Sequence, residues 1–358
     1  MPGAALDLVT LTQGGQQAQD IATRLEAFLA PAQKTLDLAL YDVRLPGPIG
    51  DRIAGALHAA ADRGVRVRIA FNDPGSSTLD HPSSNPPQTK PEILANAGGE
   101  QRSIDGDGEL MHHKYVVRDG AALWSGSMNW TLDSWTLQEN VIVTAQSAEL
   151  AASFERNFEE LWTRGHLEGS GAFDAPRVAV GDAFVRPWFC PGRGRELAHQ
   201  IATRIDRAER RIRICSPVLT SAPVLSALAE VCSEKRVDAT GVVDRTQTDQ
   251  ALRQWRAGGH TSWKAPILEH VLEGLHFAGK HSIPWSPESV HDFMHAKTSV
   301  IDDVVFIGSY NLSRSGEDNA ENVLEIEDAA LADRVATWID GVRARYAEPV
   351  AASSSTRP

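Results

Sequence analysis

The chain has 358 residues, more than one average domain, so a two-domain or duplicated architecture is the first expectation. Hydrophobic residues make up 42% and charged residues 23% of the chain, which is ordinary for a globular protein with a substantial core. The formal net charge of −12 weakly disfavours a protein whose main task is to coat nucleic acid, although it leaves room for a local basic cleft.

The N-terminus and the cysteines bear on the cellular compartment. Residues 1–20 lack a basic segment followed by an apolar one, so no signal peptide is expected, and no apolar run approaches the roughly 20 residues of a membrane span. The spacing of Cys190, Cys215 and Cys232 fits neither a zinc site nor a disulfide framework, which favours small buried thiols in a reducing compartment. The resulting prediction is a cytoplasmic protein.

The first part of the chain alternates predicted helices and strands. Apolar residues at helical spacing predict helices at 19–29 and 49–63, and strands are expected at 35–41 and 65–71. This β-α-β unit favours parallel pairing of the two strands. Residues 72–90 contain four prolines and no periodicity, so they are expected to form a loop, either a functional rim or a disordered insertion.

The remaining elements suggest that this plan is used twice. A short helix is expected near 91–97, then strands at 114–118, 121–124 and 141–143 and a helix at 148–162. Later helices are expected at 196–210, 222–233, 247–258 and 329–346, with strands at 211–215, 239–243 and 323–326. The predicted division is a first lobe at 1–170, a linker at 171–194, a second lobe at 195–350 and a disordered tail at 351–358.

A motif of the form H-x-K-x4-D occurs once in each half. Its copies are His112, Lys114 and Asp119, and His295, Lys297 and Asp302. Each copy is followed by G-S-x-N, at residues 126–129 and 308–311. Corresponding positions are separated by nearly constant distances along the chain, 183 residues from His112 to His295 and 182 from Glu139 to Glu321. Such constancy indicates duplication of a whole domain, and a pseudo-two-fold relation would bring both motifs to one interface.

The residue types suit an anionic phosphoryl group. Side chains two residues apart on a strand share a face, so His112 and Lys114 should project together, as should His295 and Lys297. The lysines supply positive charge and the histidines a nucleophile or an acid near neutral pH. Further hydroxyl and amide donors for the substrate are expected from Ser127, Asn129, Ser309 and Asn311. Together they predict a cage for the phosphoryl oxygens that contains no metal and no cofactor.

Two histidines permit a two-step transfer. One attacks phosphorus to give a covalent phosphohistidine, and the other protonates the leaving oxygen and then activates water or an alcohol. Each imidazole needs a partner on its other nitrogen, for which Glu139 and Glu321 are the candidates. Asp119 and Asp302 complete the catalytic motifs, but at the strand ends they are expected to form turns or to support the site. A metal site of His112, His113 and Asp119 is disfavoured by the lysine between the ligands.

For several other residues an ordinary structural role is favoured over a functional one. His113 should face away from His112, and the pair His291-Asp292 is expected in a surface loop, although it could extend the cleft. Stacking of tryptophans on bases or acyl chains is weighed against core packing, which is favoured. An ordinary structural role is also favoured for the following residues: His58, Arg207, Arg210, Arg211, Arg213, Trp130, Trp135, Trp263 and Trp285.

The paired motifs, each followed by G-S-x-N and by Glu-Asn at 139–140 and 321–322, resemble the phospholipase D superfamily over most of the chain. The resemblance implies two α/β sandwich lobes with a shared active site at their interface, phosphohistidine catalysis and no required metal. It also implies that His112 is the nucleophile and His295 the general acid. Residues 111–114 and 126–131 are similar to the mitochondrial cardiolipin hydrolase and Zucchini-type branch.

The sequence thus predicts a monomeric phosphodiesterase of the phospholipase D type. Its substrate is either a phospholipid head-group diester, hydrolysed or transferred to an alcohol, or a nucleic-acid backbone cleaved by a metal-independent nuclease. A non-catalytic scaffold is disfavoured, because both histidine–lysine pairs are intact. Peripheral contact with a membrane is expected without a transmembrane segment, and the loops at 72–90 and 260–291 are expected to select the substrate.

Overall fold

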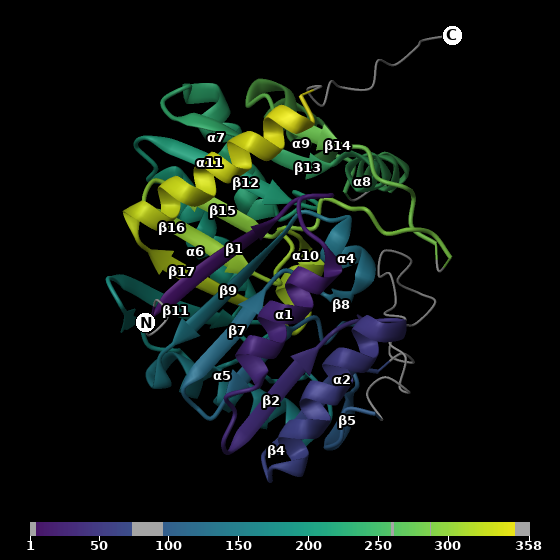
Figure 1. The fold of residues 1–358 in the computed structure, drawn as a ribbon. Coiled ribbons are helices and arrows are strands. Elements are labelled where there is room, and N and C mark those ends of the chain that lie inside the picture. The colour runs from purple at the N-terminus through teal and green to yellow at the C-terminus, as the bar shows by residue number, and fades with distance from the viewer. Residues whose placement is uncertain (1–4, 74–95, 259–260, 287, 348–358) are drawn as a thin grey trace.

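The structure is a computed structural model that describes residues 5–73, 96–258, 261–286 and 288–347. Most of the loop expected at 72–90 and of the helix expected near 91–97 lies outside the described residues, as does the tail at 351–358. The described chain forms two α/β lobes, each built on one large mixed sheet. In Figure 1 the purple and blue elements of the first lobe occupy the lower half, and most green and yellow elements of the second lobe occupy the upper half.

The first lobe contains a seven-stranded sheet in which two strand pairs are parallel. β2 runs parallel to β4, and β4 to β5, while the other neighbours are antiparallel, so the predicted β-α-β unit is confirmed. In spatial order the strands are β1 (Leu6–Leu11), β9 (Asn140–Gln146), β7 (Ala122–Gly126), β6 (Lys114–Arg118), β2 (Thr35–Leu40), β4 (Arg66–Asn72) and β5 (Glu100–Ile104). A separate short pair is formed by β3 (Val43–Arg44) and β8 (Trp130–Thr131).

The second lobe repeats this order with one strand added at the edge. In spatial order its strands are β10 (Val178–Val180), β11 (Ala183–Phe189), β17 (Asn322–Glu327), β16 (Val304–Gly308), β15 (Thr298–Ile301), β12 (Arg211–Ser216), β13 (Asp238–Asp244) and β14 (Ala278–Lys280). From β11 to β14 each strand has the position and direction of a strand in the first sheet, with β11 in place of β1. The predicted duplication of a whole α/β domain is confirmed.

The segment at 171–194 is not a plain linker, and here the structure corrects the sequence-based division. β10 and β11 lie inside it, and β11 pairs with β17 from Phe184 to Phe189. Ala183 and Val185 face the core whereas Phe184 is largely exposed, so the segment alternates as a half-buried strand does. The alternation is short and is interrupted by glycines and prolines, which is why the composition favoured a linker.

Helices cover both outer faces of the molecule and fill the space between the sheets. The outer face of the first sheet packs against α1 (Ala18–Leu29) and α2 (Gly47–Asp62). The outer face of the second packs against α6 (Gly194–Asp206), α7 (Ala222–Glu234) and α9 (Lys264–Gly274). Between the sheets lie α5 (Ala148–Arg164) and α11 (Ala329–Arg345). The fold is completed by α8 (Arg245–Ala257) and by the short helices α4 (Leu132–Thr136) and α10 (Arg314–Asp318).

The two central helices begin in the same way and share one core. Ser147 caps α5 by accepting a hydrogen bond from the Leu150 N–H, and Asp328 caps α11 by accepting one from the Leu331 N–H. One apolar cluster contains buried residues of both sheets and both helices. Within it the Phe154 ring of α5 lies 5.0 Å from the Phe189 ring of the second lobe, between centroids. The lobes therefore pack as a single body with their interface at the centre.

Several expectations for individual residues can be compared with the fold. Cys190, Cys215 and Cys232 are free and buried, as predicted. Trp130 and Trp135 are buried, but Trp263 is 53% exposed, which corrects the expectation of core packing. Three of the arginines at 207–213 have acidic partners, as an ordinary surface role requires, in the pairs Arg210–Asp303, Arg211–Asp333, Arg213–Asp238 and Arg213–Asp340. Across the described ranges, no helix is both long and apolar enough to cross a membrane.

Candidate active site

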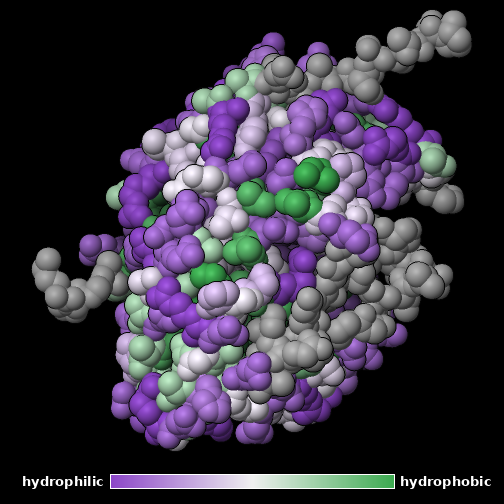
Figure 2. Space-filling model, turned by 45° about the vertical axis from the view of Figure 1, so that its right-hand side comes forward, coloured by the Kyte–Doolittle hydropathy of each residue, from purple (hydrophilic) through white to green (hydrophobic). Residues whose placement is uncertain are grey.

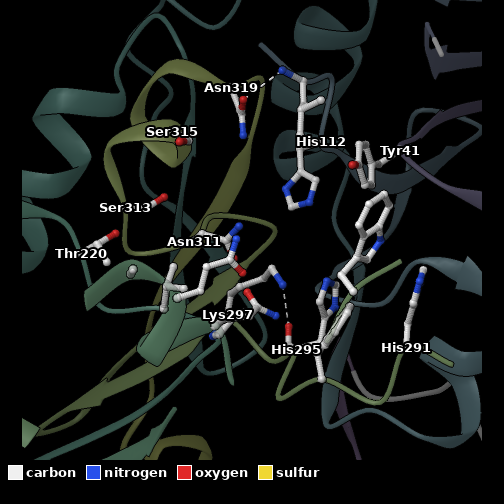
Figure 3. Close-up of a pocket in the computed structure, with 18 of the residues that line it drawn as sticks. Tyr41, His112, Thr220, His291, His295, Lys297, Asn311, Ser313, Ser315 and Asn319 are labelled. Atoms are coloured by element: carbon white, nitrogen blue, oxygen red, sulfur yellow. Dashed lines mark hydrogen bonds between the residues drawn. The ribbon is translucent and has the colours of Figure 1, made fainter. Parts of the chain in front are cut away.

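Both motif copies reach one cavity at the lobe interface. β6 begins just after His112, and β15 begins just after Lys297. A cavity of about 380 Å³ is lined by His112 and by His295, together with Lys297. In Figure 3 the two imidazoles point into this space from opposite sides. The shared site predicted from the duplication is therefore formed within one chain.

The histidines precede their strands instead of lying on them, which corrects one detail of the sequence argument. Met111 makes an isolated bridge to Ala320 of the other lobe, and the His112 N–H donates to the Ala320 carbonyl at 2.9 Å. Each lysine folds back onto its histidine: the Lys114 ammonium donates to the His112 carbonyl, and Lys297 Nζ donates to the His295 carbonyl at 2.7 Å. This hydrogen bond from the lysine side chain to the histidine carbonyl occurs in both copies and holds each lysine beside its histidine.

The imidazole of His112 is fixed by a carboxylate from the second lobe. Its Nδ1 lies 2.7 Å from Glu321 Oε1, and both side chains are buried. An Nδ1–H that donates to the carboxylate leaves the lone pair on Nε2, the nitrogen available for attack on phosphorus. Glu321 thus occupies the position that the sequence argument assigned to a histidine partner.

His295 has a different partner. Its Nδ1 lies 3.1 Å from the amide oxygen Oδ1 of Asn140. Glu139, expected to hold this histidine, instead accepts hydrogen bonds from Lys280 Nζ and from the Tyr346 hydroxyl, each at 2.7 Å. The structure therefore corrects the expected symmetric pair of carboxylates, and leaves one histidine facing a carboxylate and the other facing a neutral amide.

The register of the bridge between the lobes is shifted by one residue in the second copy, and this shift accounts for the different partner of His295. In the first copy Met111 bridges Ala320, so the next residues along the two segments, His112 and Glu321, meet. In the second copy Met294 bridges Glu139, whereas the counterpart of Ala320 is residue 138. The residue that follows Glu139 is Asn140, and it is Asn140 that meets His295.

The four residues expected to bind substrate separate into two groups. Ser127 Oγ donates to Asn140 Oδ1 at 2.7 Å, and Ser309 Oγ accepts from the Asn322 N–H at 3.0 Å. Both serines are fully buried. Ser127 supports Asn140, the partner of His295, whereas Ser309 supports Asn322, the partner of His113. Asn129 and Asn311 line the cavity, and neither Oδ1 atom has a hydrogen-bond partner among the described residues. The asparagines are thus placed to meet a substrate directly.

The aspartates of the two motifs lie at the far ends of their strands, away from the cavity. Asp119 accepts hydrogen bonds from the N–H groups of Gln33, Lys34 and Thr35 at 2.6–3.1 Å. Asp302 does the same for the N–H groups of residues 209–211 at 2.8–3.1 Å. Both have positive φ, 55° and 51°, as residues of tight turns. Their inclusion in a catalytic set is therefore corrected to the alternative role of turn formers.

Burial and the two lysines favour the neutral form of both imidazoles. Desolvation, followed by the charge of Lys114, holds the pKa of His112 well below its usual value, and the pKa of His295 is lowered in the same way, first by desolvation and then by Lys297. Desolvation also lowers the pKa of Lys114 to about 7 and raises the pKa of Glu321 to about 8. A negatively charged ligand would oppose these shifts in the lysines and histidines.

Two of the histidines that were given ordinary roles from the sequence lie close to the site. His113 is fully buried, its Nδ1 lies 3.1 Å from Asn322 Oδ1, and it has the structural role that was predicted. His291 is also buried and lines the cavity, so its expected place in a surface loop is wrong and the extension of the cleft is correct. Its ring stacks between Trp285 and Phe293, with centroids 6.2 Å and 5.4 Å away.

Other cavity residues could not be found from the motifs. Tyr41 lies edge-on to His112, with ring centroids 4.5 Å apart, and its ring lies 4.8 Å from Lys114 Nζ. The wall formed by α8 presents Gln247, Gln250 and Gln254. Their spacing places them on one helical face, and this was the only available signal. No three His, Cys, Asp or Glu side chains in the described part of the chain are grouped so as to hold a metal ion.

The chain has two α/β lobes, and each lobe contributes one His-Lys motif to a shared cavity. This arrangement defines the phospholipase D-like class of protein. The family described as "Cardiolipin synthase, PLD-like domain" matches residues 25–162 and 201–343, and the chain belongs to this family. The superfamily recognised from the motifs is thereby confirmed.

Curated relatives match a part of the chain. Mitochondrial cardiolipin hydrolase of Xenopus tropicalis is 31% identical over 141 residues, 39% of this chain and 60% of that protein. The human protein of the same name is 31% identical over 166 residues, 45% of this chain and 59% of that protein. The chain thus spans about 60% of the length of these relatives.

Solved structures share the fold over nearly the whole chain. Phosphatidylserine synthase of Haemophilus influenzae superposes with a TM-score of 0.65 and 13% identity, covering 95% of this chain and 86% of that one. Polyphosphate kinase of Porphyromonas gingivalis gives a TM-score of 0.57 and 14% identity, covering 94% and 50%. At these identities the likeness establishes the two-lobe fold alone.

Proposed function

We propose that the protein is a phosphodiesterase that cleaves a phospholipid head-group diester through a covalent phosphohistidine on His112. The observation that carries this proposal is the pair of buried imidazoles facing one cavity, His112 bonded to Glu321 and His295 to Asn140. Lys114 and Lys297 supply the positive charge that a phosphodiester needs in a buried site.

In the first step Nε2 of His112 attacks phosphorus, an N–P bond forms, and the bond from phosphorus to the leaving alcohol oxygen breaks. When Glu321 is ionised, its carboxylate accepts the Nδ1–H of His112 and stabilises the positive charge that develops on that ring. His295 donates its proton to the leaving oxygen. The charge of a bound diester opposes the effects of burial and of Lys297, so it raises the pKa of His295 and lets that ring hold a proton in the complex.

In the second step His295 takes a proton from water, or from an alcohol, whose oxygen attacks phosphorus. The N–P bond breaks and His112 is regenerated, with a phosphomonoester as the product of hydrolysis or a new diester as the product of transfer. Both histidines therefore return to their starting protonation states. All groups needed come from one chain, which agrees with the expected monomer.

The cavity walls favour a small head group over a nucleic-acid backbone. Two arginines of the wall are ion-paired, Arg44 with Asp42 at 3.1 Å and Arg314 with Asp318 at 2.7 Å. Such pairing reduces the attraction for a row of phosphates, and the net charge of −12 acts in the same direction. Relatives named mitochondrial cardiolipin hydrolase support a phospholipid as well.

We propose that the cavity mouth meets a membrane surface. Trp263, Ile283 and Val290 are 45–53% exposed, and each lies within two residues of a residue that lines the cavity. Figure 2 shows a face that is largely hydrophilic, with hydrophobic residues in small groups. Contact would then involve a few inserted side chains. Replacing Trp263 by Ser should reduce sedimentation with anionic vesicles several-fold, and unchanged sedimentation would refute this contact.

The activity is tested by incubating the protein, in excess chelator, with vesicles of cardiolipin, of phosphatidylglycerol and of phosphatidylcholine, and with single-stranded DNA and RNA. We expect head-group release from at least one lipid and a phosphoenzyme that is absent from His112→Ala. His58→Ala, an exposed histidine far from the motifs, is the matched control and should be fully active. Cleavage of nucleic acid alone would replace the lipid assignment by the nuclease, and activity of His112→Ala would overturn both.

A further inference from the structure

A buried charge cluster lies beside the catalytic histidine of the second lobe. Glu139 is fully buried, and its two oxygens accept hydrogen bonds from Lys280 and from Tyr346. Lys280 is 2% exposed and also donates to the Leu137 carbonyl at 3.0 Å. The cluster therefore joins a residue of the first lobe to the last strand of the second sheet and to the end of α11.

The first lobe lacks both partners at the matching positions. In the parallel pairing of β13 and β14, Lys280 lies opposite Asp244 in the backbone register. The Asp244 side chain accepts a hydrogen bond from the Met294 N–H at 2.9 Å. The counterpart of Asp244 is Asn72, which accepts from the Met111 N–H at 2.7 Å and pairs with Ile104. Ile104, the counterpart of Lys280, has no charge to offer a carboxylate.

The hydroxyl partner is missing in the same way. Tyr346 follows α11, and the residue that follows α5 is Gly165, which has no side chain. Glu321, the counterpart of Glu139, therefore meets neither a lysine from the sheet edge nor a tyrosine from the helix end, and it bonds to His112. The cation and the hydroxyl that hold Glu139 are additions to one half of a duplicated framework.

We propose that Lys280 is a positioning residue that holds the Glu139 carboxylate away from His295, so that the neutral amide of Asn140 orients this histidine and the two catalytic imidazoles become chemically different. A carboxylate on Nδ1 stabilises a positive ring, as a covalent nucleophile needs, whereas an amide oxygen leaves the ring a readier proton donor. His112 and His295 thereby receive their separate roles from one lysine.

The cationic groups around His295 act in one direction, and the two nearby carboxylates are bonded to other partners. Desolvation, followed by the charges of Lys297, Lys114 and His291, lowers the pKa of His295, and His112 faces it across the cavity. On the opposite side are Asp244, bonded to the Met294 N–H, and Glu139, neutralised by Lys280. Removing the charge of Lys280 leaves the Glu139 carboxylate buried and without its cation, one residue before Asn140, which bonds to His295.

The test is a histidine NMR titration of the full chain without substrate, with the His295 signal assigned by its loss in His295→Gln. In the wild type the His295 ring should stay neutral between pH 5 and 8. In Lys280→Met its midpoint should rise by at least one pH unit, while His112 is unchanged. Lys280→Arg keeps the charge and should behave as the wild type, and Lys280→Met/Glu139→Gln should cancel the rise.

An unchanged His295 midpoint in folded Lys280→Met would overturn the proposal, as would an equal rise in the double variant. If Lys280→Met does not fold, Lys280→Gln removes the charge while keeping a donor to Glu139, and the same shift is expected. The inference relies on the proposed two-histidine chemistry for its meaning in catalysis. Because the titration needs no substrate, its failure is separate from failure of the proposed activity. In an active enzyme, the pH–rate profile should shift with the His295 midpoint.

Discussion

His112 of the first lobe and Glu321 of the second are joined by a hydrogen bond of 2.7 Å between fully or nearly fully buried side chains. The two residues are 209 positions apart in the chain, so the bond exists only when the lobes are docked. The backbone supports it, because the His112 N–H donates to Ala320, the residue before Glu321. Formation of the nucleophile and closure of the lobe interface are therefore one structural event.

We expect Glu321→Gln to lower kcat/KM by about 10²- to 10⁴-fold, because an amide can neither accept the Nδ1–H as strongly nor stabilise a charged ring. Steady-state kinetics with the active lipid measure this. Glu325→Gln is the control, since Glu325 lies on β17, the strand that Glu321 immediately precedes, but bonds to Arg204 and Trp188. It should leave kcat/KM within a few-fold of the wild type. Equal losses in the two variants would show that Glu321 acts through stability alone.

Anion binding should weaken as the pH rises above neutrality. Burial lowers the pKa of Lys114 to about 7, so the ammonium is charged below that pH in the empty site and loses its proton above it. A short phosphonate monoester carries one negative charge throughout pH 6–9, so any change in its Kd reports on the protein. Calorimetry should find at least about tenfold weaker binding at pH 9 than at pH 6. In Lys114→Met binding should be weak at both pH values; an undiminished pH dependence there would rule out Lys114 as its source.

Asp119 and Asp302 should matter for stability and little for catalysis. Each carboxylate accepts three backbone N–H bonds, and loss of bonds to a charged group in Asp119→Ala should lower the free energy of unfolding by about 1–3 kcal/mol. These bonds hold the pKa of Asp119 below its usual value, so the stabilisation is present above pH 4 and is lost as the pH falls through the folded-state pKa. Urea unfolding at pH 7 measures it, and Asp119→Asn, which tolerates positive φ, should lose less. A large fall in kcat with unchanged stability would contradict this role.

The sequence was sufficient for the fold because duplication leaves a regular signal. Near-constant spacing between the copies of the motif requires two similar lobes, and the alternation of helices and strands predicts a parallel β-α-β unit in each. The positions of His112 and His295 at one cavity follow from that symmetry. Strands such as β11 were missed, because their short alternation is broken by proline and glycine.

The asymmetry of the site could not be predicted in the same way. It depends on a shift of one residue where Glu139 meets Met294, and no local pattern encodes the register between segments so far apart. It depends also on Lys280, whose contact with Glu139 spans 141 positions and whose strand has only three residues. Sequence symmetry thus suggested two equivalent carboxylates, whereas packing of the sheet edge and of Tyr346 makes them different.

Replacing Tyr41 tests whether its aromatic ring, in the cavity wall, assists the Lys114 ammonium. Its ring lies 4.8 Å from Lys114 Nζ and edge-on to His112, so it offers a negative face to the ammonium and a wall to the imidazole. Tyr41→Leu should lower kcat/KM by about 2- to 30-fold, the kinetic equivalent of a cation–π contact of about 0.5–2 kcal/mol. Tyr41→Phe keeps both ring contacts and should lose less, with circular dichroism to show that both variants are folded. If leucine works as well as tyrosine, Lys114 is held by its bond to the His112 carbonyl alone, and the ring only fills space.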